Sequence, residues 1–168
     1  LLEVIQWDLD PTYEVKFNLT VERELPGNVS LSVGYLGGRG IHLWRSTVAN
    51  ASFNTIVDGR EFVAPRTPRA NPNAGLGDFR VSDAQSFYNG LQFHVRKRFD
   101  HGFQFQSSYT WSKTVDDSST ATANTDYQEG ASSRPFHTKA DRGLSAIHLA
   151  HNFVLNGSWA LPFPADLG

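Results

Sequence analysis

Three aspartates, Asp116, Asp117 and Asp126, lie in one polar stretch of the sequence, and carboxylates are the ligands that hard cations such as Ca²⁺ prefer. The regular ligand spacing and the glycine of a calcium loop are absent, so we interpret these aspartates as solvated loop residues. His148 and His151 are also of a metal-binding type, but a separation of three places them on opposite faces of a strand. The sequence therefore predicts no metal site.

Other residues with chemical potential favour structural roles. Asp141-Arg142-Gly143 can form a charged turn in which Arg142 pairs with a neighbouring carboxylate. The glycine-rich run at residues 37–40 is not followed by a lysine and hydroxyl pair, so we predict a flexible loop entrance and no phosphate site. No nucleophile elbow marks a catalytic serine. We predict no catalytic residue, no cofactor and no enzymatic activity, and we identify no particular ligand-binding residue.

The elements that would position these residues are strands, because apolar and polar residues alternate with a period of two. Between residues 15 and 21, for example, every odd position is Val, Phe or Leu and every even position is polar. The predicted strands cover about residues 13–25, 29–36, 86–99, 103–112 and 147–161. Two long loops, about residues 37–85 and 113–145, separate them, and short β pieces at residues 41–44 and 79–81 of the first loop could extend the flanking strands. No stretch shows the 3.6-residue period of a convincing helix.

One hairpin pattern occurs twice. VERELPGNVSLSVGY, residues 21–35, reappears as VRKRFDHGFQFQSSY, residues 95–109. Pro-Gly-Asn in the first copy and Asp-His-Gly in the second supply the turn. Short turns therefore alternate with very long connections along this chain.

Composition excludes several classes of protein. The 15 basic and 17 acidic residues give a net charge of -2, so we expect no nucleic-acid partner. There is no cysteine for disulfides or thiolate metal sites, and no apolar run approaches the roughly 18 residues that a membrane helix needs. The first residue is Leu1, from which we expect a processed chain, a truncated chain or a fragment.

The strand pattern favours a transmembrane β-barrel wall. Strands that cross a bilayer have about 9 to 11 residues, and short turns on one side with long loops on the other are typical of such barrels. The polar face would line a watery lumen and the apolar face would contact outer-membrane lipid. The alternative is a soluble β-sandwich whose apolar faces pack against each other. We predict an all-β fold, one partial up-and-down antiparallel barrel of about five strands over residues 1–168, with extracellular long loops.

An ordered series of motifs carries a family resemblance. The motifs are VERELPGN at residues 21–28, YLGGRGIHL at 35–43, YNGLQFHVRKRF at 88–99, YTWSK at 109–113, ADRGLS at 140–145 and HNFV at 151–154. Together they resemble the barrel of TonB-dependent outer-membrane receptors, in particular the Oar-like group with a carboxypeptidase-regulatory-like N-terminal domain. The resemblance covers residues 13–163.

The resemblance implies a 22-stranded barrel with an N-terminal plug domain, which imports bulky nutrients with energy from the TonB complex. This sequence departs from that pattern in having about five strands, no plug and no recognisable TonB box. We therefore expect part of such a barrel in a bacterial outer membrane, with the plug and the TonB complex as partners in the full receptor.

Two alternative functions remain open. A detached barrel piece would have unpaired strand edges, which recruit other strands, so copies of the chain could assemble into an extracellular oligomer or filament. The other alternative is a soluble β-sandwich adhesin or glycan-binding module.

Overall fold

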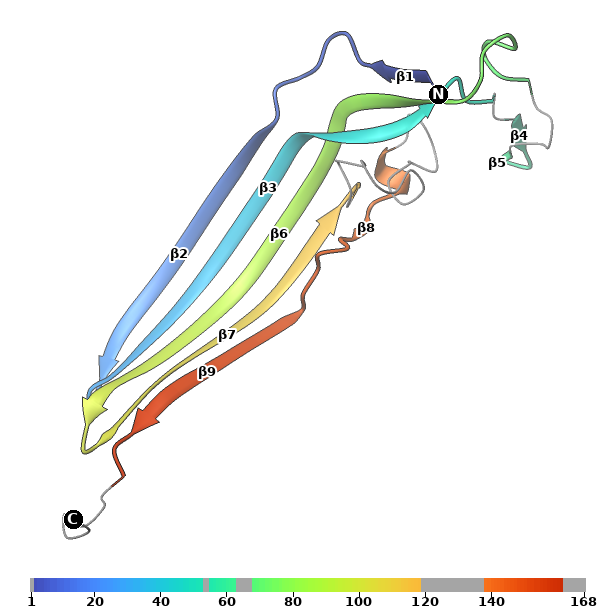
Figure 1. The fold of residues 1–168 in the computed structure, drawn as a ribbon. Coiled ribbons are helices and arrows are strands. Elements are labelled where there is room, and N and C mark those ends of the chain that lie inside the picture. The colour runs from blue at the N-terminus through green and yellow to red at the C-terminus, as the bar shows by residue number, and fades with distance from the viewer. Residues whose placement is uncertain (1, 53–54, 63–67, 119–137, 162–168) are drawn as a thin grey trace, which may run out of the picture. The chain divides into compact units, whose positions relative to one another are not determined.

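A computed structural model describes residues 2–52, 55–62, 68–118 and 138–161 of the chain (Figure 1). These residues fall into two compact units. Unit 1 contains the described residues within 1–14, 40–86 and 115–146, and unit 2 contains those within 15–39, 87–114 and 147–168.

Strands make up nearly all of the regular secondary structure among the described residues. Their bounds are β1 (Leu2–Ile5), β2 (Tyr13–Leu25), β3 (Val29–Ala49), β4 (Thr55–Val57), β5 (Arg60–Phe62), β6 (Gly77–Asp100), β7 (Phe103–Asp116), β8 (Gly143–Leu144) and β9 (His151–Trp159). A single 3₁₀ turn, Thr138–Ala140, precedes β8. No helix in the described ranges is long and apolar enough to cross a membrane.

Seven of these strands form one sheet with the order β2-β3-β6-β7-β8, in which β9 pairs with β7 (Figure 1). The β7–β9 ladder is antiparallel and runs without interruption from the pair Phe103 and Trp159 to the pair Trp111 and His151. In unit 1, β1 pairs in parallel with the first residues of β6, and β4 and β5 form a separate hairpin. The predicted all-β, antiparallel fold is thus confirmed, and the sheet is open.

Tight turns join the long strands where the sequence predicts them. His101 and Gly102 both have positive φ, 51° and 79°, as a two-residue type I′ hairpin turn requires. Gly27 and Asn28 have φ of 83° and 59° in the other turn. Glycine and asparagine tolerate this left-handed region better than most residues, so the local sequence specifies both reversals.

Several strands extend beyond their predicted ends. β3 continues to Ala49 and β6 begins at Gly77, so much of the predicted loop at residues 37–85, including the glycine-rich run, is strand. The alternation of apolar and polar residues does not predict a strand there, because His42 has a φ of 55° within β3 and the consecutive residues 45–47 are all buried. At the other end of the chain, β9 begins at His151, four residues later than predicted.

The two units differ in what they bury. In the described part of unit 2, the buried residues are three glycines, Gly34, Gly37 and Gly90. In unit 1 they include two apolar side chains, Val81 and Ala84, and several polar or charged ones: Arg45, Ser46, Thr47, Ser82, Asp116, Asp117 and Ser145. The described part of unit 2 is therefore a single layer of sheet with no apolar core.

Candidate functional site

One face of unit 2 carries large apolar side chains that remain exposed. Leu19 is 70% exposed, Phe153 63% and Trp159 64%. Burying such side chains against a second layer would stabilise a soluble sandwich by about 1.5 to 3 kcal/mol each. Their exposure argues against the predicted sandwich alternative and leaves a face that suits an apolar solvent.

Aromatic rings form contacts along this apolar face. Tyr109 stacks between Phe93 and His151, with centroid distances of 6.3 and 6.1 Å, and its hydroxyl group lies 2.8 Å from His151 Nδ1. On β2 and β3, the Phe17 ring contacts Tyr35 and covers Gly37, where an added Cβ atom would lie 2.1 Å from the ring. The aromatic rings therefore replace a second layer by packing along the sheet surface.

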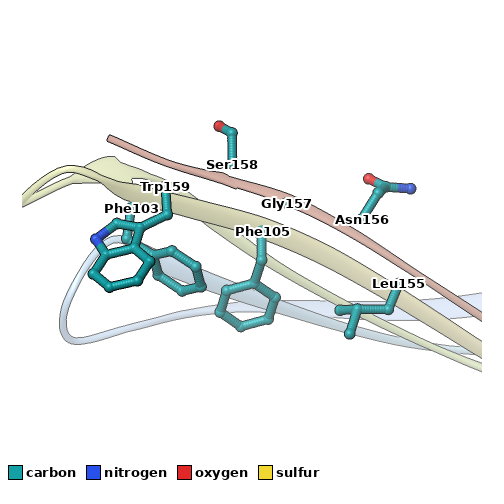
Figure 2. A pocket seen from close by; sticks show the side chains of 7 residues that line it. All are labelled: Phe103, Phe105, Leu155, Asn156, Gly157, Ser158 and Trp159. Atoms are coloured by element: carbon teal, nitrogen blue, oxygen red, sulfur yellow. The ribbon is translucent and has the colours of Figure 1, made fainter. Parts of the chain in front are cut away.

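A groove of about 450 Å³ opens on the apolar face over Gly157. Figure 2 shows the side chains of Phe103, Phe105, Leu155 and Trp159 on one side of the β7 and β9 ribbons. The side chains of Asn156 and Ser158 point to the opposite side (Figure 2). Strand alternation thus separates an apolar face from a polar face at this place in the sheet.

The polar face carries a second hollow of about 340 Å³. Its lining consists of Arg96, Lys97, Gln104, Phe105, Gln106, Asn156, Gly157 and Ser158. The ladder pairs Gln104 with Ser158 and Gln106 with Asn156, and the Gln104 side-chain amide donates a 2.9 Å hydrogen bond to Ser158 Oγ. We name these eight residues the polar hollow. It combines two cations with amide and hydroxyl groups and is our candidate functional site.

The turns next to the polar hollow are fixed by polar contacts. Lys97 Nζ donates a 2.9 Å hydrogen bond to the carbonyl of Gly27, and Arg98 pairs with Glu24 at 2.7 Å. In the turn after β6, Asp100 accepts a hydrogen bond from His101 Nδ1 at 2.8 Å, and this bond is the main cause of a lowered pKa for Asp100. These contacts join the two hairpin turns of unit 2.

A buried ion pair organises the described part of unit 1. Both oxygens of Asp117 accept hydrogen bonds from Arg142, at 2.6 and 3.1 Å, and the Asp117 side chain is fully buried. Asp117 Oδ2 also accepts from the Gln85 backbone N–H, while the Asp117 N–H donates to the Gln85 carbonyl. Hydrogen bonding to Asp117 raises the pKa of Arg142. This pair holds the segment before β8 against the ends of β6 and β7.

These contacts confirm one sequence prediction and correct another. Arg142 does pair with a carboxylate, as predicted. The solvated loop predicted for Asp116 and Asp117 is wrong, because β7 extends to Asp116 and both side chains are buried against neighbouring strands. Asp126 lies outside the described residues. No group of three metal-binding side chains occurs among the residues that the structure describes.

The two histidines have separate partners. His148 Nδ1 accepts a 3.2 Å hydrogen bond from the Thr114 backbone N–H, whereas His151 contacts Tyr109. Arg39, from the glycine-rich run, lies over the Phe87 ring at 5.3 Å within paired strands, so the flexible loop entrance predicted there is wrong.

Sequence reasoning did not find the polar hollow. Its residues come from three strands, and only the β7–β9 register shows that Gln104 and Gln106 face Ser158 and Asn156. The signal available in the sequence was the run of polar residues at even positions of both segments.

The family model described as an outer membrane beta barrel domain matches residues 2–166. No curated protein and no solved structure matches the chain.

Proposed function

Since the chain belongs to the outer membrane beta barrel domain family, we propose that it forms part of the wall of a TonB-dependent transporter that imports a bulky nutrient. The observation that carries this proposal is a one-layer sheet with an exposed apolar face and a polar opposite face. In an outer-membrane barrel the apolar face contacts lipid and the polar face lines the lumen. The resemblance of the ordered motif series to TonB-dependent receptors supports the finer assignment.

Strand length supports a membrane crossing by unit 2. The β7–β9 ladder covers nine consecutive pairs, and eight steps of about 3.4 Å give roughly 27 Å along the strand. A tilt of about 40° reduces this length to roughly 21 Å, which is close to the apolar band of about 25 Å in such barrels. Residues with ring side chains occupy both ends of this ladder, where interfacial aromatic residues are expected. At one end Phe103 pairs with Trp159, and at the other end Trp111 pairs with His151.

Connection length supports an orientation. The turns at residues 26–28 and 101–102 are short, and the segments between β3 and β6 and between β7 and β9 are long. Short turns of outer-membrane barrels are periplasmic and long loops are extracellular. In this proposal, the polar hollow near the short turns belongs to the periplasmic half of the lumen.

The test combines the flanking reading frame with a direct assay of coupling. We expect an upstream plug domain with a TonB box and about seventeen further strands, which would complete a wide barrel. Site-directed cross-linking in bacterial outer membranes should then join that TonB box to the periplasmic domain of TonB. A reading frame without a plug, or a complete receptor that never cross-links, would overturn the transporter assignment.

A second candidate function rests on the open sheet edges. Among the described residues, β2 pairs only with β3 and β9 pairs only with β7, so each strand has one free edge. Unpaired edges recruit other strands, and copies of the chain could assemble through β2 and β9. Electron microscopy of the purified chain tests this function: rings or filaments support it, and a uniform population of single-chain particles contradicts it.

A further inference from the structure

We propose that the polar hollow binds an oxyanion, such as a phosphate or carboxylate group of the nutrient that passes through the lumen. This inference rests on the proposed function, because it requires the polar face of unit 2 to line a water-filled lumen. It adds the charge of the ligand to that function.

The charge of the lining favours an anion. Arg96 and Lys97 contribute two positive charges, and no carboxylate belongs to the lining. A cation would find no charged ligand there, whereas an oxyanion would find two charges and several hydrogen-bond donors. Charge complementarity therefore selects the sign of the ligand.

Arg96 is the residue best suited to hold the oxyanion. It is exposed, and it forms no ion pair with the residues that the structure describes. Its neighbours are engaged, since Arg98 pairs with Glu24 and one donor position of Lys97 Nζ is used by the Gly27 carbonyl. A guanidinium presents a planar fork that binds carboxylate or phosphate through two hydrogen bonds.

Four uncharged side chains form a matched block beside these cations. Gln104 lies opposite Ser158 and Gln106 lies opposite Asn156 in an uninterrupted antiparallel ladder, so all four share one face. Because Gln104 donates to Ser158 Oγ, the hydroxyl proton of Ser158 can point to a ligand. The carboxamides of Gln106 and Asn156 add further N–H donors. Placement on paired strands fixes these groups better than a loop would.

The test titrates the full chain, folded in zwitterionic detergent micelles, with inorganic phosphate. Side-chain NH₂ resonances of Gln104, Gln106 and Asn156 report on the polar hollow by NMR. We expect saturable shifts of these resonances with phosphate and none with the neutral disaccharide maltose. Arg96→Gln should raise the phosphate Kd about tenfold to a hundredfold, since a hydrogen bond to a charged group contributes about 1.5 to 3 kcal/mol.

Arg23→Gln is the matched control. Arg23 is an exposed arginine of β2 outside the polar hollow, and its loss changes the net charge by the same amount. The phosphate Kd should stay within a factor of two of the unmodified chain. Equal weakening by Arg23→Gln and Arg96→Gln would show unspecific attraction and overturn the proposal. Shifts without saturation, or an equal response to maltose, would also overturn it.

Failure of this inference is distinguishable from failure of the transporter assignment. Circular dichroism of the same samples reports whether the β-sheet has formed. If the chain is folded but does not bind phosphate, the anion-site proposal is wrong and the barrel-wall assignment is unaffected. If the chain binds phosphate but its full receptor never cross-links to TonB, the anion-site proposal is supported and the TonB-dependent transport assignment is wrong.

Discussion

Unit 2 leaves its apolar side chains exposed, whereas unit 1 buries charged ones. In unit 2, Leu19 and Trp159 are each more than 60% exposed, and in unit 1 the carboxylate of Asp117 is fully buried. A soluble domain normally does the reverse in both respects. In the proposed function, the apolar residues of unit 2 stabilise the chain through contact with lipid, while the described part of unit 1 depends on paired polar groups.

The largest expected effect comes from placing a charge on the apolar face. Leu19→Arg should destabilise the protein in lipid vesicles by about 2 to 4 kcal/mol if Leu19 lies near the bilayer midplane. The measurement is the free energy of unfolding by urea in vesicles. At an ordinary exposed position in water, the same substitution would change stability by about 0.5 kcal/mol or less.

Asn18→Arg is the control for that prediction. Asn18 is adjacent to Leu19 on β2 and occupies the opposite face by strand alternation. Its substitution should leave the unfolding free energy nearly unchanged. If the two arginine variants were equally stable in vesicles, the assignment of the apolar face to lipid would be wrong.

A smaller effect is expected from breaking the buried ion pair of unit 1. Asp117→Asn should destabilise the protein by about 2 kcal/mol, below the usual 3 to 5 kcal/mol for a buried pair, because the Arg142 side chain is 31% exposed. Amide hydrogen exchange at residues 143–146 should also become faster. Unfolding by denaturant, combined with exchange, checks both outcomes.

The matched control is Glu3→Gln, which removes the exposed ion pair between Glu3 and Arg80. Exposed pairs contribute about 0 to 1 kcal/mol, so this variant should resemble the unmodified protein. A cost for Glu3→Gln as large as that for Asp117→Asn would show that burial does not distinguish the two pairs.

The smallest effect concerns pH at a turn of unit 2. Hydrogen bonding from His101 lowers the pKa of Asp100 from its ordinary value of 3.8. The ionised carboxylate therefore stabilises the folded turn at pH values above 3.8. This contribution is lost as the pH falls through the lowered pKa of Asp100. Titration of the Asp100 carboxyl carbon by NMR should give a midpoint below 3.8.

His101→Gln is the variant that sharpens this prediction. Removal of the imidazole donor should move the Asp100 midpoint back up toward its ordinary value. A midpoint that does not move on this substitution would assign the lowered pKa to Lys97 or Asn28, which make the smaller contributions.

The sequence predicted the parts of the fold that depend on local patterns. Alternation located the strands of unit 2, and Gly27, Asn28 and Gly102 marked the turns. Charge pairing for Arg142 was also predicted, but its partner was not, because Asp117 lies 25 residues earlier in a polar run that resembles a solvated loop. The strand extensions through residues 40–49 and 77–85 were predicted only in part, as the short β pieces at residues 41–44 and 79–81. Their full length was missed, since polar side chains are buried there and the two-residue period disappears.

The parallel pairing of β1 with β6 has a consequence for folding kinetics. Leu2 pairs with Gly77, a separation of 75 residues, whereas the hairpins on either side of residues 26–28 and 101–102 close locally. Closing a long loop costs more chain entropy than closing a short one, and contacts of high sequence separation slow folding. We therefore expect β1 to dock late, onto a β6 strand that β3 and β7 have already ordered.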